Sequence, residues 1–331
     1  MKLARWIALL AVVAIAVSAL AGCAGAKSSK YPAKSIELVA AGSPGGGLDT
    51  AARVLDDVVK KEKVNANFVI TNKEGGGGNV ARSYLVEKKG DDYVLIYESN
   101  RVWLNNLMGT TQYSIEDTTP IARTTTEFEA WAVKADSKYK TAQDIIDAVK
   151  KDPASVTFGV GTIPSDDQFN ILRPLMAKGV DVSKVKLTAF RSGGDLMTNL
   201  LGGHVDVIST SVSEAAAQAE AGKARILTVS SDKRLTGKAV KDTPTWKELG
   251  IDVVISHWRG LFGPPGMSAA AVKYWDDTLG KLVKTKSWTD ALAKMEQEDA
   301  YLNSAAFKDY LLKEREANKP IIEKFVGQKK P

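Results

Sequence analysis

Residues 35–49 read Ser-Ile-Glu-Leu-Val-Ala-Ala-Gly-Ser-Pro-Gly-Gly-Gly-Leu-Asp. The first six residues alternate and then become apolar, which is the pattern of a strand that enters a buried sheet. The glycines end this strand. Beyond them, apolar residues recur from Ala51 to Val59 at the spacing of one helical face. A strand, a glycine loop and a helix in this order indicate an α/β fold.

The rest of the chain repeats this alternation. Strands are predicted at residues 68–70, 93–97, 131–133, 156–160, 186–190, 205–209 and 225–229, and helices at 80–88, from Thr141 to Pro153, up to about Lys178, and at 269–284 and 304–325. This order predicts two open α/β domains, each a parallel sheet with helices on both faces, and a binding crevice between them. The predicted first domain comprises residues 31–127 and 227–331 with the C-terminal helices, and the second comprises 128–226.

The N-terminal residues predict export. Lys2 and Arg5 precede an apolar run from Trp6 to Leu20, and Leu20-Ala21-Gly22-Cys23 follows. A short apolar core behind a basic start is typical of a signal peptide, here residues 1–22. The last four residues look like a bacterial lipobox, which predicts lipidation of Cys23, the single cysteine. On this prediction residues 23–30 form a tether, and the protein is expected to be anchored outside the cell membrane. An uncleaved anchor helix with a chance cysteine is the alternative.

Composition narrows the class of ligand. The formal net charge is +6, and removal of Lys2 and Arg5 with the signal peptide leaves a modest positive excess. Such an excess suits an anionic small ligand or an anionic membrane surface. Basic runs interleaved with aromatic residues are missing from the sequence, so nucleic acid is not expected as a partner.

The loop from Ser43 to Asp49 predicts an anion site. Gly45, Gly46 and Gly47 leave bare backbone N–H groups at the positive end of a helix, where negative charge is favoured. Asp49 is expected to cap this helix by accepting from the amides of Ala51 or Ala52. A tight turn without a ligand is the alternative, because a glycine-rich loop by itself is a weak signal.

A second loop of the same kind spans residues 159–168. Gly161 supplies bare backbone, and Thr162 and Ser165 supply hydroxyl donors, while Ser165, Asp166 and Asp167 can cap the following helix. If the two aspartates instead lined the site, they would repel a dicarboxylate and attract the ammonium of an amino acid. We expect the capping role.

A third candidate loop spans Arg191 to Asp195 and includes Ser192. In this loop a cap at Asp195 and a solvated Arg191 are the simpler interpretation.

Catalytic and metal signals are weak. His204 and His257 are isolated in the sequence and lack metal-ligand spacing, so both are expected to be structural. Adjacent acidic pairs such as Asp91-Asp92 and Asp276-Asp277 are better explained by caps and turns. The sequence lacks a nucleophile elbow and a zinc-protease motif, so no cofactor, metal or enzymatic activity is predicted.

Taken together, the motifs resemble one family, the substrate-binding receptors of tripartite tricarboxylate transporters of the Bug type. Nine fragments in order carry the resemblance: residues 31–34, 44–53, 72–79, 92–93, 159–162, 201–206, 222–225, 244–250 and 258–266.

The resemblance implies a type II periplasmic-binding-protein clamshell that closes on a small carboxylate and delivers it to membrane permease subunits. It implies ligand contacts at Gly45, Gly46, Gly47, Gly161, Thr162 and Ser165, and less firmly at Asn79 and Ser192. Many members place a histidine after the second loop, and Gln168 is the nearest equivalent here. A receptor for an amino acid or another oxyanion, a secreted hydrolase and a structural lipoprotein are the alternatives.

Overall fold

The computed structural model describes residues 31–190, 193–295 and 297–327. The chain divides into two units, residues 1–33 and 34–331, and the fold described below belongs to the second. The predicted signal peptide, the tether, Cys23, Arg191 and Ser192 lie outside the described residues. Within the described ranges, no helix has the length and apolar character needed to cross a membrane.

One sheet contains the first strands of the chain. Strands β1 (Ile36–Ala40), β2 (Phe68–Asn72) and β3 (Val94–Glu98) are parallel, with β1 between the other two. β9 (Ser256–Gly263) pairs antiparallel with β3 and with β4 (Thr119–Lys134), and β10 (Glu298–Leu302) pairs with β4. We call these strands, with the first half of β4, the first lobe.

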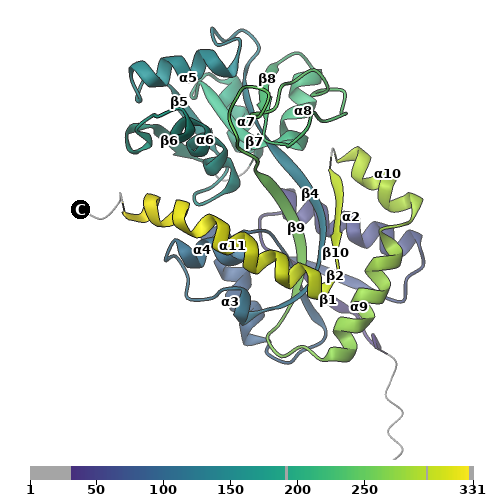
Figure 1. Cartoon of the computed structure of the whole chain (residues 1–331). Coiled ribbons are helices and arrows are strands. Elements are labelled where there is room, and N and C mark those ends of the chain that lie inside the picture. Colours follow the sequence, from purple (N-terminus) through teal and green to yellow (C-terminus); the bar gives the residue numbers. More distant parts are fainter. Residues whose placement is uncertain (1–30, 191–192, 296, 328–331) are drawn as a thin grey trace, which may run out of the picture. The chain divides into compact units, whose positions relative to one another are not determined.

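A second sheet uses the other half of β4. Residues Glu129 to Lys134 pair antiparallel with β7 (Val207–Ser211) and β8 (Ala224–Val229). β5 (Thr157–Val160) lies between β7 and β6 (Lys186–Ala189), parallel to both. We call this sheet and its helices the second lobe. β4 is one continuous strand of 16 residues that belongs to both sheets (Figure 1).

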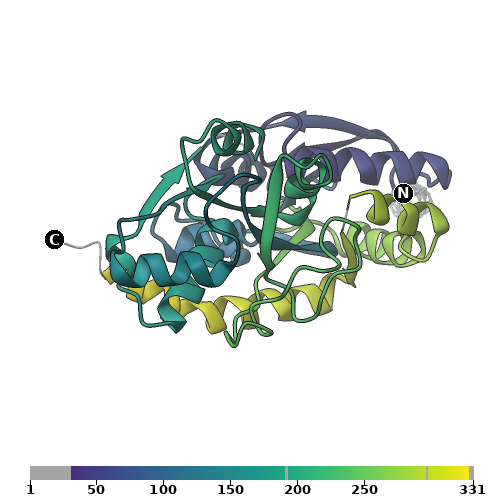
Figure 2. The ribbon, with the colours of Figure 1, turned by 90° about the horizontal axis from the view of Figure 1, so that it is seen from above.

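Helices cover both faces of the sheets. In Figure 2 the purple α2 and the yellow α11 lie on opposite sides of the strands. In chain order the helices are α2 (Gly47–Lys61), α3 (Asn79–Glu87), α4 (Arg101–Leu107), α5 (Ala142–Lys151), α6 (Asp166–Ala177), α7 (Gly193–Leu201), α8 (Val212–Glu220), α9 (Ala269–Leu282), α10 (Lys286–Lys294) and α11 (Ser304–Gly327), with 3₁₀ turns at Gly76–Gly78, Ile115–Asp117 and Val182–Lys184.

The predicted α/β class with helices on both faces is confirmed. The prediction of parallel sheets holds for the pairings among β1, β2 and β3 and among β5, β6 and β7, but not for the pairings of β4 and β9. Both sheets are mixed, because β4 and β9 run antiparallel to their neighbours. The prediction of a short strand at 131–133 also missed most of β4, in which the threonines at residues 124–126 and the glutamates at residues 127 and 129 are buried. β9, β10, α4, α8 and α10 were not predicted. The predicted domain boundaries stay a prediction.

A buried polar contact fixes the helix that begins at the second predicted loop. Asn170 of α6 is fully buried, and its carbonyl oxygen accepts from the indole N–H of Trp131 at 2.9 Å. Its side-chain oxygen accepts from Trp246 at 2.8 Å, and its side-chain amide donates to Ser209 at 3.0 Å. Because buried polar groups strongly favour being paired, this network sets the position of α6 on the sheet.

Candidate functional site

A cavity of about 570 Å³ lies at the carboxyl ends of the parallel strands, where open α/β sheets bind ligands. Loops from both lobes contribute to its lining: residues 41–43 and 46–48 after β1, 74–75 and 77–78 after β2, 100–101 after β3, and 161–162 and 165–167 after β5. His257 and Arg259 of β9 and Glu214 of α8 complete much of the wall. The two predicted glycine loops therefore face the same cavity.

The first glycine loop is folded around Asp49. This carboxylate accepts from the backbone N–H of Gly45 at 2.9 Å, from Arg53 at 2.9 and 3.0 Å, and from Asn72 at 3.0 Å. Burial by itself would raise the pKa of Asp49, but these hydrogen bonds hold it below its usual value.

The predicted cap from Asp49 to Ala51 or Ala52 is wrong. The N-cap residue is Gly46, which makes no side-chain capping bond. Asp49 is therefore the third helical residue, and an acidic side chain at that position reaches back to the N–H groups before the helix.

Arg259 packs on the same loop. A Cβ atom on Gly47 would come within 2.8 Å of Nη2 of Arg259, so the absence of a side chain at residue 47 lets the guanidinium reach the start of α2. Gly46 and Gly47 line the cavity, whereas Gly45 does not.

A buried ion pair supports the neighbouring loop at residues 74–78. Arg82 and Glu98 lie 2.5 Å apart, and both side chains are 1% exposed. Arg82 also donates to the carbonyl of Gly77 and to the side-chain oxygen of Asn79. Asn79 is further held by Asn105 and Thr110, and it is not among the residues that line the cavity.

The second-lobe loop is also folded around an aspartate. Asp167 accepts from the backbone N–H of Gly161 at 2.7 Å. Ser165 is the N-cap of α6 and accepts from the N–H of Gln168 at 3.1 Å. Gly161, Thr162, Ser165, Asp166 and Asp167 all line the cavity. The amides of Gly45 and Gly161 thus each bind a carboxylate of the chain itself.

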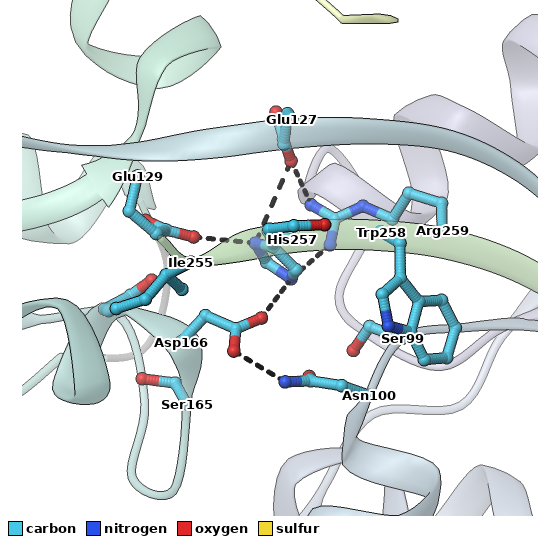
Figure 3. A network of polar contacts seen from close by, with 12 residues as sticks. Ser99, Asn100, Glu127, Glu129, Ser165, Asp166, Ile255, His257, Trp258 and Arg259 are labelled. Atoms are coloured by element: carbon cyan, nitrogen blue, oxygen red, sulfur yellow. Dashed lines mark hydrogen bonds and ion pairs between the residues drawn. The ribbon is translucent and has the colours of Figure 1, made fainter. Parts of the chain in front are cut away.

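Asp166 connects the second lobe to the first. Its Oδ1 accepts from the side-chain amide of Asn100 at 2.6 Å, and its Oδ2 lies 3.9 Å from Nε2 of His257 (Figure 3). Asp166 is 5% exposed. Burial raises its pKa to about 8, and the charges of Glu314 and Asp167 add to the rise, against the hydrogen bond from Asn100 and the charge of Arg259.

The base of the site is built by residues two positions apart on neighbouring strands. Glu127 lies opposite His257 in the antiparallel pair of β4 and β9. Residues i and i+2 share a face of a strand, so Glu129 and Arg259 lie on the same side. His257 Nδ1 is 2.9 Å from Glu129 Oε1, and Arg259 is paired with Glu127 and also contacts His257 Nε2 (Figure 3).

Burial shifts the ionisation of these groups strongly. It lowers the pKa of His257 well below its usual value, and the charges of Arg259 and Arg101 lower it further, so the imidazole is neutral. Burial and the neighbouring carboxylates raise the pKa of Glu129. The pKa of Asp167 is likewise raised by burial.

Glu214 is an exposed residue that lines the cavity, and its carboxyl group packs against the start of α7. Burial raises the pKa of Glu214 to about 7, although Thr210 donates a hydrogen bond to it. The carboxyl lies against the first residue of α7, because a Cβ on Gly193 would come within 2.3 Å of it.

Arg101 differs from Arg259 in that no described acidic residue forms a salt bridge with it. It is the first residue of α4 and lines the cavity. Arg259, by contrast, is already neutralised by Glu127. Within the described ranges, Arg101 has no salt-bridge partner, so its guanidinium can accept a negative group from a ligand.

Several residues that line the cavity were not predicted as site residues, among them Arg101, Glu214, Arg259 and His257, the last of which was expected to be purely structural. Glu127 and Glu129, which pair with Arg259 and His257, were not predicted either. Two sequence features pointed to part of this set. Residues 127–129 and 257–259 each place charged or polar side chains two apart within a strand, which directs both to one face. The ligand contacts predicted for the glycine loops stay a prediction.

This fold and this cavity define a solute-binding protein of the periplasmic class. The model of the tripartite tricarboxylate transporter family receptor matches residues 51–326. The chain therefore belongs to this family of transporter receptors, which includes the Bug proteins.

Individual relatives agree with this assignment. A Cupriavidus necator protein named "UPF0065 protein in gbd 5'region" is 29% identical over 307 residues, covering 91% of this chain and 90% of the relative. BugT of Bordetella pertussis is 24% identical over 291 residues, covering 86% and 87%. A crystal structure of a TctC solute-binding protein from Polaromonas without ligand has a TM-score of 0.69 and 28% identity, covering 89% of this chain and 99% of that chain.

Two structures with ligands share the fold. MatC from Rhodopseudomonas palustris with bound malate has a TM-score of 0.77 at 18% identity, covering 88% of this chain and 100% of that chain. An R. palustris protein with adipate has a TM-score of 0.78 at 20% identity, covering 90% and 98%.

Proposed function

We propose that this receptor captures a small organic acid outside the cell membrane, binds its carboxylate at Arg101, and delivers it to the permease subunits of a tripartite tricarboxylate transporter. The observation that carries this proposal is a cavity-lining guanidinium without an ion pair among the described residues. A guanidinium matches a carboxylate with two parallel N–H donors. Bound malate and adipate in the two fold neighbours are consistent with an acid as ligand.

The first turn of α2 supports the same carboxylate. The first amides of a helix have no intrahelical acceptor, and they face negative charge favourably. Gly47 and Leu48 begin this helix and line the cavity. The amides of Gly45 and Gly161 are already bound to Asp49 and Asp167, so Arg101 and α2 are the stronger donors for a ligand.

Replacement of Arg101 tests the proposal. Loss of one hydrogen-bonded charge costs about 1.5–3 kcal/mol, so Arg101→Gln should weaken binding of an organic acid by about 10- to 150-fold. Isothermal titration calorimetry with a panel of small mono- and dicarboxylates measures this. Arg234→Gln is the control, since Arg234 is half-exposed and paired with Glu248 outside the cavity. Equal affinity of wild type and Arg101→Gln would refute the docking of the acid on Arg101.

The receptor is proposed to bind its solute without chemical change. Mass spectrometry of the acid after prolonged incubation with the protein should recover it intact. A time-dependent product that requires the folded protein would point to the hydrolase alternative.

The lipid anchor on Cys23 is proposed from the sequence alone. Cys23→Ser should leave an unprocessed precursor or release the receptor into the medium, because the acylated thiol is the attachment point. Membrane fractionation and radioactive fatty-acid labelling measure this, and normal labelling of the variant would contradict the proposal.

A further inference from the structure

The second-lobe wall of the cavity is acidic. Asp166, Asp167 and Glu214 line it, and Glu129 lies within hydrogen-bond reach of Asp167 beneath it. Two carboxyl groups at that distance share the contact only if one of them holds a proton. Among the second-lobe residues that the structure describes in this wall, none carries a positive charge. A plain dicarboxylate that spans the cavity from Arg101 would place its second negative group against these carboxyls.

Buried acceptors in this wall lack donors. Asp166 is 95% buried and lines the cavity, and its Oδ1 receives the amide of Asn100. Its Oδ2 receives no hydrogen bond from a described residue, and neither does Oε2 of the fully buried Glu129, whose Oε1 lies beside Nδ1 of His257. Burial of a polar atom without a partner is costly. Because Asp166 lines the cavity, a ligand that brings an N–H donor to this side chain would satisfy its unpaired acceptor.

A metal ion fits this group less well than an N–H donor does. Glu129, Asp166 and His257 each offer one ligand atom, and these atoms lie within 4.8 Å of one another. However, Arg259 contacts His257 Nε2, and a guanidinium can only donate. In the neutral ring the proton is therefore on Nδ1, which lies beside Glu129 Oε1. Neither ring nitrogen then has a lone pair available for a metal.

We propose that the wall formed by Asp166, Asp167 and Glu214 is a subsite for a protonated amine, and that the ligand is a small amino acid. The carboxylate of the ligand pairs with Arg101, so this assignment rests on the proposed function. The ammonium group supplies three donors and a positive charge, where the wall supplies acceptors and negative charge. Burial is the main cause of the raised pKa values of Asp166 and Glu214. These carboxyl groups therefore partly hold protons in the ligand-free protein, and a bound ammonium group would supply the positive charge in place of those protons.

Matched ligands test the subsite by calorimetry. Succinate is compared with aspartate and glutarate with glutamate, so that each pair differs by one added amine. Glutarate is also compared with 5-aminopentanoate, in which an amine takes the place of the second carboxylate. We expect the amine-bearing member of at least one comparison to bind about tenfold or more tightly than its amine-free counterpart, as a charge-assisted hydrogen bond provides.

Two variants test whether the acidic wall causes the tighter binding of amine-bearing ligands. Asp167→Asn and Glu214→Gln keep an acceptor oxygen for Gly161 and Thr210 but remove the charge. Each should reduce the preference for the amine severalfold, while binding of succinate and glutarate stays equal or improves. Glu220→Gln is the control, since Glu220 is an exposed acid at the other end of the same helix as Glu214.

The outcomes separate this inference from the proposed function. If acids with and without an amine all fail to bind, or if Arg101→Gln leaves binding intact, the proposed function fails and the inference fails with it. If amine-free acids bind as tightly or more tightly, or if both variants keep the amine preference, only the subsite is refuted. A preference for dicarboxylates that requires Mg²⁺, Mn²⁺ or Zn²⁺ and disappears with a chelator would replace the amine with a metal ion.

Discussion

The ion pair between Arg82 and Glu98 should determine how firmly the loop at residues 74–78 is held. Both side chains are 1% exposed, and Arg82 binds the loop carbonyl of Gly77 as well as Glu98. Arg82→Met removes the cation and leaves a buried carboxylate. The loss of one partner from a buried pair costs about 3–5 kcal/mol. At about 2 °C per kcal/mol for a protein of this size, the melting temperature should fall by about 6–10 °C.

Thermal denaturation and urea titration measure this effect. The control is Lys286→Met, which breaks an exposed pair with Asp290 at 2.7 Å whose side chains are 85% and 54% exposed. Such a pair contributes about 0.5 kcal/mol or less. Replacing both partners, Arg82→Met with Glu98→Leu, should recover part of the lost stability, because the unpaired charge is gone. If Arg82→Met is no more destabilising than Lys286→Met, the pair does not support the loop as reasoned.

Two further changes probe the cavity wall. Gly47→Ala forces a Cβ against Arg259 and should lower the free energy of unfolding, measured by urea titration, by about 1–3 kcal/mol through overpacking. Gly42→Ala is the control and should have little effect, because its Cβ meets open space. Equal effects of the two variants would show that the Arg259 side chain moves aside without cost. The stability of the ligand-free protein should also depend on pH. Because the folded-state pKa values of Asp166 and Glu214 are raised to about 8 and 7, the folded state holds extra protons. For the buried Asp166 this contribution is complete below about pH 4 and is lost as pH rises towards 8, by up to about 1.4 kcal/mol per pH unit. Glu214 contributes less, because it is exposed and solvent screens its charge. Asp166→Asn should flatten the curve of melting temperature against pH, and an unchanged slope would contradict the buried state of this carboxyl.

Local patterns predicted most of the strands and helices because they depend on neighbouring residues. The apolar run before the first glycines marks β1, and the capping box at Thr141 marks the start of α5, where Thr141 and Asp144 exchange hydrogen bonds. The length of β4 was missed because a run of threonines and glutamates is typical of an exposed segment. These residues are buried here because both edges of β4 are paired and its polar side chains are bonded to partners far along the chain, such as Tyr97 with Thr124.

The candidate site was predicted only in part, for a related reason. Gly46, Gly47 and the residues from Gly161 to Asp167 follow strands directly, so their place at the sheet edge can be inferred from the order of elements. The contact between Glu127 and Arg259 joins residues 132 positions apart. It depends on the antiparallel register of β4 and β9, which no local pattern determines.

The glycine loops show where a motif predicts a backbone conformation but leaves its binding partner open. Bare amides at a helix start favour a carboxylate, and in this chain carboxylates are indeed bound at Gly45 and Gly161, but they belong to Asp49 and Asp167. A ligand anion therefore gains most from a cation that the chain has left without an ion pair, and among the described residues of the cavity Arg101 meets that condition. Since the second-lobe wall presents Asp166 and Glu214, Arg101 and that wall differ in the sign of the charge they can carry. A ligand with one charge of each sign fits this separation better than one with two negative ends.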